Sequence, residues 1–310
     1  MFSLLHVHFE AVLRAIAETR PDLLKNVQRT FSSASYHAAS PAQRLHLLEG
    51  QIKLLAQSNQ DLFTEEVFER VVQTFFQQLE LSQVEHVDLR IGITPTKWQW
   101  MSTIADGIQV FERERQRYPT ISLSFLGALN FAKSFAEIDK IVERLLGDPF
   151  VRDTFVGVDV NVLPEDLPKL RYYAPVILLA QQQGMKINIH LGELFENAVS
   201  KEILSCVVPH RIGHGVRLLE DESLVAFIQQ HDICLDMCPV SNTRLGVCNW
   251  HLAPNPAKKA IQLGIPVTIN TDDPILFQTT LSQEIALARL TASEVRIIQD
   301  TGRKYRYRHE

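Results

Sequence analysis

The chain has 310 residues, of which 45% are hydrophobic and 22% are charged, which is enough apolar material for one large core. Its formal net charge of −5 lacks the basic excess of a nucleic-acid-binding protein, so no nucleic-acid partner is expected. Uncharged runs fall short of the roughly 18 apolar residues of a membrane helix, and the amino terminus has no secretory signal pattern, so the sequence predicts a cytoplasmic protein without a membrane partner.

Strand-like runs rich in Val, Ile and Leu recur along the chain, mostly separated by amphipathic helical stretches. This alternation is typical of βαβ units and a parallel sheet. The expected strands lie near residues 2–8, 85–93, 120–128, 154–162, 186–191, 209–213, 233–237 and 265–271. The expected helices between them include 98–117, 135–146, 167–184, 219–230 and 256–263. Eight strands close a barrel, and no Gly/Ser-rich linker divides the chain. The sequence therefore predicts one α/β domain, residues 1–310, with a (β/α)8 TIM-barrel fold.

About 75 residues separate the first two expected strands and predict a helical insertion over about residues 10–83. Within it, residues 61–79 carry apolar side chains at i, i+3, i+4 and i+7, the spacing of an amphipathic helix. Ser40 and Pro41 resemble the N-cap and first-turn proline of another helix. Because the insertion leaves the functional rim of the barrel, it can be a lid over the site or a packing buttress, and the sequence favours neither.

Two other features carry no assigned chemistry. The four cysteines, Cys206, Cys234, Cys238 and Cys248, have no C-x-x-C spacing, which argues against a structural zinc cluster. The basic segment 303–308 is predicted to be a solvated terminus, with a binding patch as the less favoured alternative.

Polar motifs directly follow four of the expected strands. His6 and His8 alternate with Val7, so in a strand both imidazoles lie on the same face. His190 and Asp272 follow two other strands, and the carboxyl ends of parallel strands converge. Three histidines, one aspartate and one open position make a plausible catalytic zinc shell. The sequence therefore predicts one Zn²⁺ per chain, an ion that lowers the pKa of a coordinated water from about 15.7 to near 7.

Two further groups are candidates for proton transfer. Glu193 lies three residues after His190, where it can move a proton without binding the ion; the alternative is an N-cap or a charge in the first turn of the next helix. His214 lies between two glycines, where the backbone can turn sharply, and can orient or deprotonate the water; the alternative is a buried core histidine. Asp273 follows Asp272 and points the other way in extended chain, toward a substrate.

Five segments in order resemble motifs of the adenosine/AMP deaminase family: LHVHFEA, INIHLGE, RIGHG, CPVSN and TINTDDP. The resemblance runs from residue 2 to about residue 285 and is strongest over 186–277. It implies an eight-stranded barrel with one zinc, held by His6, His8, His190 and Asp272. Related enzymes with two metals bridge them through a lysine, which FVGVDVNVLPE lacks. The implied activity is hydrolytic deamination of adenosine or a related 6-aminopurine, a small-molecule substrate.

The resemblance also implies a role for each remaining group. His214 activates the water, Glu193 protonates the ring nitrogen N1, and Asp273 hydrogen-bonds N7. Hydroxide then adds at C6 and ammonia leaves. Glu10 is placed near the ribose of nucleoside substrates, and Gly192 belongs to the substrate-binding set.

The sequence departs from the family around the pocket that selects the substrate. Residues 9–11 replace a small acidic or amide residue followed by glycine, and 161–165 do not reproduce an Ala-Gly-acidic turn that meets purine N3. Asp88 and Arg90 stand where the family has a Glu-x-Arg pattern and are expected to form internal ion pairs. Two alternatives therefore stay open: hydrolysis of a different C–N bond on the same scaffold, or purine binding without catalysis.

Overall fold

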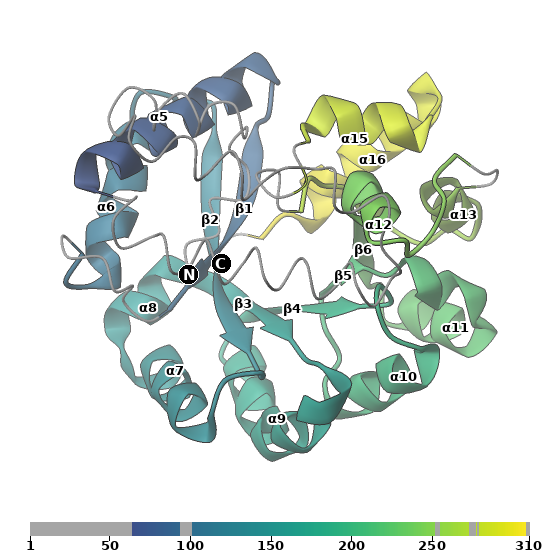
Figure 1. Ribbon diagram of the computed structural model, residues 1–310, viewed down its shortest axis with the longest axis horizontal. Helices are drawn as coiled ribbons and strands as arrows, with labels where there is room; N and C mark the ends of the chain where they lie inside the picture. The colour runs from purple at the N-terminus through teal and green to yellow at the C-terminus, as the bar shows by residue number, and fades with distance from the viewer. Residues whose placement is uncertain (1–63, 94–100, 252–254, 273–276, 278, 308–310) are drawn as a thin grey trace.

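The computed structural model describes residues 64–93, 101–251, 255–272, 277 and 279–307. Within these ranges seven strands form one sheet, every neighbouring pair is parallel, and the order in space is the order in the chain. The strands are β1 (His86–Gly92), β2 (Ser122–Asn130), β3 (Phe155–Asn161), β4 (Lys186–Leu191), β5 (Arg211–His214), β6 (Cys234–Met237) and β7 (Val267–Ile269). Figure 1 shows the sheet curling about a central axis with helices around its outside.

The helices mostly follow strands in chain order. They are α5 (Glu65–Leu81), α6 (Ile104–Arg115), α7 (Phe135–Gly147), α8 (Pro149–Thr154), α9 (Leu167–Gln182), α10 (Asn197–Cys206), α11 (Glu222–Gln230), α12 (Pro239–Arg244), α13 (Pro256–Gln262), α15 (Leu281–Ala288) and α16 (Ala292–Tyr305). Two 3₁₀ turns cover Pro164–Asp166 and Val216–Glu220. No helix within the described ranges is long and apolar enough to cross a membrane.

The predicted parallel α/β barrel class is confirmed. The seven expected strands from 85–93 onward are present, whereas the expected strand at 2–8 and the helix start at Ser40–Pro41 lie outside the described residues. One expected helix, 219–230, is wrong in its first part. The Asp221 carboxylate accepts hydrogen bonds from the amides of Ser223 and Leu224, so it caps a new helix, α11, after a 3₁₀ turn.

The strands are apolar because both faces of a parallel sheet are covered. In β3 every residue except Asn161 is buried, and most are β-branched or aromatic. Gly157 is required within this strand, since a Cβ atom there would lie 2.0 Å from the carbonyl oxygen of Lys186 on β4. A single carboxylate, Asp159, interrupts the apolar run of β3.

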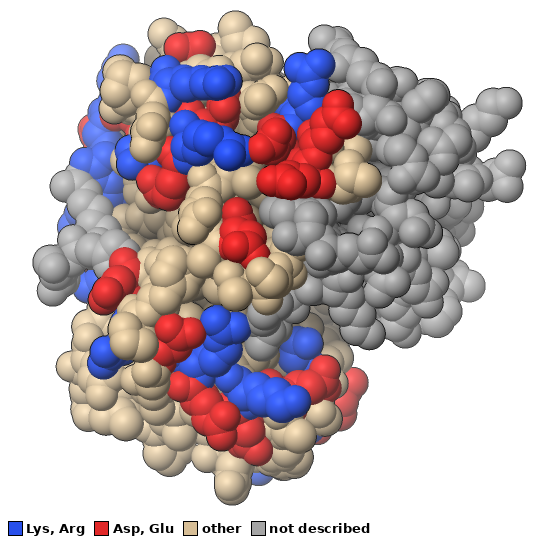
Figure 2. Space-filling view, turned by 90° about the vertical axis from the view of Figure 1, so that its left-hand side faces the viewer, with Lys and Arg blue, Asp and Glu red and all other residues tan. Residues whose placement is uncertain are grey.

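The helix expected at 61–79 is confirmed as α5, and it packs on the outside of the barrel. The rings of Phe68 and Phe75 meet Phe111 of α6 edge-on, with centroids 5.8 and 5.9 Å apart. Figure 1 shows α5 beside α6 at the outer surface. This helix is therefore a packing buttress, while the insertion before residue 64 lies outside the described residues. Figure 2 views this side of the molecule and shows acidic and basic side chains of the described residues interspersed over it.

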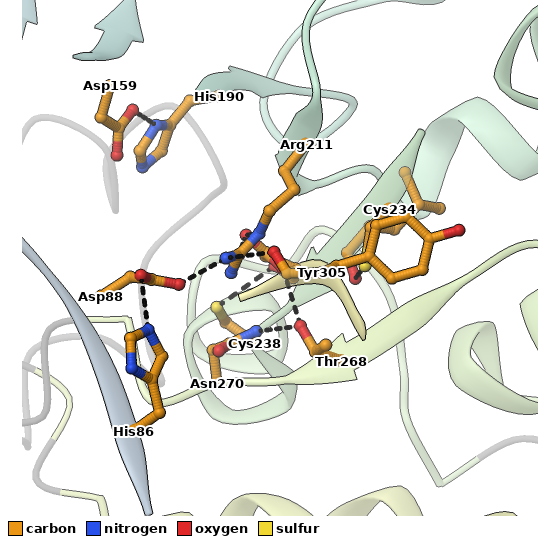
Figure 3. A network of polar contacts seen from close by, with 12 residues as sticks. His86, Asp88, Asp159, His190, Arg211, Cys234, Cys238, Thr268, Asn270 and Tyr305 are labelled. Carbon is orange, nitrogen blue, oxygen red and sulfur yellow. Dashed lines mark hydrogen bonds and ion pairs between the residues drawn. The ribbon is translucent and has the colours of Figure 1, made fainter. Parts of the chain in front are cut away.

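The interior of the barrel near the amino ends of the strands is charged. The guanidinium of Arg211 donates to Asp236 through Nε at 2.8 Å and to Asp88 through Nη1 at 2.5 Å, and His86 lies 2.9 Å from Asp88 (Figure 3). Asp88 is thus in an internal ion pair, as expected. Burial alone would raise the pKa of Asp88, but Arg211 holds it below its usual range.

The carboxyl-terminal segment closes this end of the barrel. Tyr307 is 4% exposed, the Arg211 guanidinium lies 4.7 Å from the centre of its ring, and its carbonyl accepts a hydrogen bond from the Ser124 hydroxyl at 3.0 Å. The prediction of a solvated terminus is therefore wrong for Tyr307, although Arg303 and Lys304 are exposed. The aromatic ring covers a desolvated guanidinium, which the basic character of the segment did not indicate.

Candidate active site

His190, at the carboxyl end of β4, is held by a carboxylate from the neighbouring strand. Its Nδ1 lies 2.8 Å from Oδ1 of Asp159 on β3, as Figure 3 shows. The other oxygen of Asp159 lies 3.4 Å from Nε of Arg90, so Arg90 is also in an internal ion pair. Burial alone would raise the pKa of Asp159, but His190 and Arg90 hold it below its usual range. An ionised Asp159 accepts a hydrogen bond from Nδ1–H of His190, which leaves Nε2 to bind a metal, the arrangement typical of a metal-ligating histidine.

Glu193 and His214 lie next to each other and share a third residue. Oε1 of Glu193 is 3.4 Å from Nδ1 of His214. The Asn242 amide nitrogen lies 3.3 Å from the same Glu193 oxygen and 3.1 Å from the same His214 nitrogen. His214 is 2% exposed and Asn242 is fully buried. Asn242 therefore links the two predicted proton-transfer groups from α12, 49 residues beyond Glu193.

Burial raises the pKa of Glu193; the charge of Asp272 adds to this, while His214 opposes it. A carboxyl group with a raised pKa retains its proton nearer neutral pH, which suits a general acid. Glu193 lies in a bend before α10, whose N-cap is Glu196. The alternative role for Glu193 in the first turn of the next helix is therefore wrong.

His214 and Asp272 both have left-handed backbone conformations, with φ of 67° and 56°. Such conformations are uncommon outside glycine and are retained where the surrounding structure demands a particular side-chain direction. Gly192 also has a positive φ, of 66°, and a Cβ there would lie 2.6 Å from Cγ of Leu218. Gly192 is thus required by the turn after β4.

Donor atoms of a kind that bind zinc converge beside these residues. One ligand atom each of His214, Cys238 and Asp272 lies within 4.8 Å of the others, and the rings of His190 and His214 are 5.3 Å apart. Imidazole, carboxylate and thiol are all zinc donors, so the residues present fit the predicted ion. Burial raises the pKa of the Cys238 thiol well above its usual range, and the charge of Asp272 adds to this.

The structure brings the described members of the predicted site together at one end of the barrel: Gly192, His190, Glu193, His214 and Asp272. The other predicted members, His6, His8, Glu10 and Asp273, lie outside the described residues. Asp159, Cys238 and Asn242 also belong to the site, and no role was predicted for them from the sequence. A lone carboxylate in an apolar strand is a usable signal for Asp159. The CPVSN motif is one for Asn242, although the contacts of Asn242 come from distant segments and do not follow from the motif.

Asp159→Asn is expected to weaken zinc binding about 10- to 100-fold, because a second residue that orients a ligating histidine typically contributes that much. An amide in place of the carboxylate no longer fixes the proton on Nδ1 of His190. The measurement is competition for zinc with a chromogenic chelator. Asp153→Asn, at an exposed position of α8, is the matched control and should bind zinc as the parent protein does. Equal affinities for the two variants would contradict the role of Asp159.

Comparison with known proteins places the chain in a family. The family model described as adenosine deaminase matches residues 5–296. An aminodeoxyfutalosine deaminase of Acidothermus cellulolyticus is 37% identical over 139 residues, which span 43% of this chain and 39% of that protein. An adenine deaminase of Rhodospirillum rubrum is 27% identical over 288 residues, which span 91% of this chain and 83% of that protein.

A solved structure agrees in fold. The crystal structure of an Arabidopsis N6-mAMP deaminase superposes with a TM-score of 0.74 at 16% identity and covers 99% of this chain and 92% of that one. The family model spans nearly the whole chain, including every described strand. The chain therefore belongs to the adenosine deaminase family of hydrolases.

Proposed function

We propose that this protein is a zinc-dependent hydrolase that deaminates a 6-aminopurine compound, releasing ammonia and the 6-oxo product. The observation that carries the proposal is the buried group of Glu193, His214 and Asn242 beside Asp272. It places a carboxyl group whose pKa is raised by burial next to an imidazole and the proposed metal ligand Asp272, an arrangement suited to adding water to a ring carbon.

The zinc ion is assigned to His190 and Asp272, together with His6 and His8 beyond the described residues. When bound, zinc supplies a water-derived nucleophile at neutral pH. Asp159 orients His190 toward this site. His214 takes a proton from the attacking water, and its neighbour Glu193 gives a proton to ring nitrogen N1 as oxygen adds at C6. His214 then gives its proton to the amino group and the C6 hydroxyl gives its proton to Glu193, so that the C6–N bond breaks, the 6-oxo group forms and ammonia leaves.

The substrate class follows from the relatives. Their names include adenine deaminase and aminodeoxyfutalosine deaminase, a free base and a larger aminopurine compound. Both carry an amino group on a purine ring, so the proposed reaction is removal of that amino group. In the proposed complex Asp273 hydrogen-bonds N7, Gly192 lies at the substrate and Glu10 meets a ribose when one is present. Retention of Glu193 and His214 side by side favours this activity over purine binding alone.

The test is ammonia release by the zinc-loaded protein against adenine, adenosine, 2′-deoxyadenosine, AMP, N6-methyl-AMP and 5′-modified adenosines. Turnover of at least one compound, with a 6-oxo product of matching mass, is the expected result. Zinc-loaded Glu193→Gln protein, purified in the same way, is the control for contaminating deaminases. Release of ammonia at the same rate by that variant, or no release from any compound by protein holding one zinc per chain, would reject the proposal.

A further inference from the structure

The short helix α12 begins without a cap of its own. The first backbone N–H groups of a helix have no partner inside it, and a Ser, Thr, Asp or Asn at the N-cap usually accepts one of them. The N-cap of α12 is Cys238, whose side chain makes no capping hydrogen bond. The next residue, Pro239, has no N–H to satisfy. The first donor of α12 that needs a partner is therefore the amide of Val240.

Glu284 supplies that partner from another helix. It lies on α15, 44 residues further along the chain, and its Oε2 accepts the Val240 N–H at 2.8 Å. The side chain is fully buried, and the side chain of Thr279 is the other hydrogen-bonding group beside its carboxyl. Burial raises the pKa of Glu284 to about 7, while the Val240 N–H opposes the rise. A carboxyl group buried in this way costs free energy, and the hydrogen bond that it accepts from Val240 joins it to the start of α12.

The cap comes from outside because the N-cap position faces the active site. The Sγ atom of Cys238 lies within 4.8 Å of the donor atoms of His214 and Asp272. A serine or aspartate side chain at position 238 that capped α12 would point toward the helix and away from His214 and Asp272. The Cys238 side chain therefore lies in the active site, and α15 supplies the cap of α12 through Glu284.

The helix that Glu284 anchors carries Asn242, two residues after Val240. Asn242 is the residue that links Glu193 to His214, with contacts of 3.3 and 3.1 Å. A shift of the first turn of α12 moves the Asn242 amide with it. Displacements of about 1 Å in a positioning group can cost about a hundredfold in rate.

We propose that Glu284 is a positioning residue for deamination: by accepting the Val240 N–H it fixes α12, so that Asn242 holds Glu193 and His214 together. The consequence for turnover rests on the proposed function, whereas the anchoring of α12 does not.

The test compares two substitutions of similar size. Glu284→Gln keeps an oxygen acceptor at the same reach, and Glu284→Met removes it. We expect Glu284→Met to lower kcat about 10- to 100-fold, with KM changed much less and a shifted pH profile of kcat/KM. Glu284→Gln should restore kcat to within about threefold of the parent, since the hydrogen bond to Val240 is retained. A Glu284→Met protein that has a lower Tm but unchanged kcat, KM and pH profile would show a role in stability alone and overturn the proposal.

A second readout does not depend on activity. Amide hydrogen exchange of residues 238–246 is expected to be faster in Glu284→Met and unchanged in Glu284→Gln. This measurement stands even when the parent protein deaminates none of the compounds tested, so failure of the proposed function and failure of the anchor are distinct results. Exchange in Glu284→Met equal to that of the parent would overturn the anchor.

If Glu284→Met does not fold, Glu284→Asp takes its place. It keeps a carboxyl group but is one methylene shorter, which draws the oxygen away from the Val240 N–H. We expect Glu284→Asp to have a lower kcat than Glu284→Gln, because the length of the side chain, and not its charge, decides whether its oxygen accepts the Val240 N–H. The opposite order would overturn the proposal.

Discussion

Glu193→Gln is expected to lower turnover by at least a few hundredfold while zinc binding and KM stay close to those of the parent. Proton transfer by a positioned acid typically contributes about 10² to 10⁴ in rate, and the amide has the same shape but no proton to give. Glutamine can still accept from the Asn242 amide, so the arrangement around His214 is retained. The measurement is kcat and KM on the compound that the ammonia assay identifies.

Glu196→Gln is the matched control for this substitution. Glu196 is an exposed glutamate three residues further on, and its side chain makes no capping hydrogen bond to α10. This variant should keep full turnover. Elemental analysis and Tm establish that both variants hold zinc and fold. Turnover of Glu193→Gln above about a tenth of the parent value would remove Glu193 from the role of general acid.

Asp272→Ala is expected to lose zinc, and turnover is expected to fall with it by about a thousandfold or more, since the ion contributes several kcal/mol to the barrier. Asp272 follows β7 in a left-handed conformation, and its carboxylate lies within 4.8 Å of donor atoms on two neighbouring strand ends. Removal of one ligand of four leaves the remaining histidines with a weaker and more open site.

Zinc per chain, measured after dialysis against buffer with a trace of chelator, is the direct readout. Asp300→Ala, at an exposed position of α16 with 75% of its side chain accessible, is the control and should hold one zinc. A full complement of zinc in Asp272→Ala would contradict the assigned ligand set. Zinc content that falls without loss of turnover would contradict the role of the ion in the reaction.

The fold was predictable because its signal is local. Runs such as FVGVDVN and MKINIH are buried on both faces, so their composition alone marks them as parallel strands, and the structure has them at β3 and β4. The convergence of His190, His214 and Asp272 was predictable as well, because the carboxyl ends of parallel strands share one edge. The short helices α8 and α12 were not predicted, since six residues hold too few turns for a periodic pattern.

The supporting residues of the site could not be found in the same way. Asp159 and His190 are 31 residues apart, and Val240 and Glu284 are 44 residues apart. Such pairs meet only after the barrel closes and the helices pack, so neither sequence position alone identifies its partner. The prediction that residues 303–308 are solvated was wrong for Tyr307 for the same reason. Tyr307 is buried, and it contacts Ser124 of β2, which is distant in the sequence.

The burial of Tyr307 also sets the order in which the protein can be made. A ribosome adds Tyr307 long after Ser124, yet the Tyr307 carbonyl accepts a hydrogen bond from the Ser124 hydroxyl, 183 residues earlier in the chain. While the chain is still growing, Arg211 and its two aspartates already exist, but the ring that covers them does not. Contacts over such distances in sequence form slowly, since the whole intervening chain must be ordered first. The amino end of the barrel is therefore completed only after Tyr307 has left the ribosome, and until then the growing chain carries an uncovered, charged interior around Arg211.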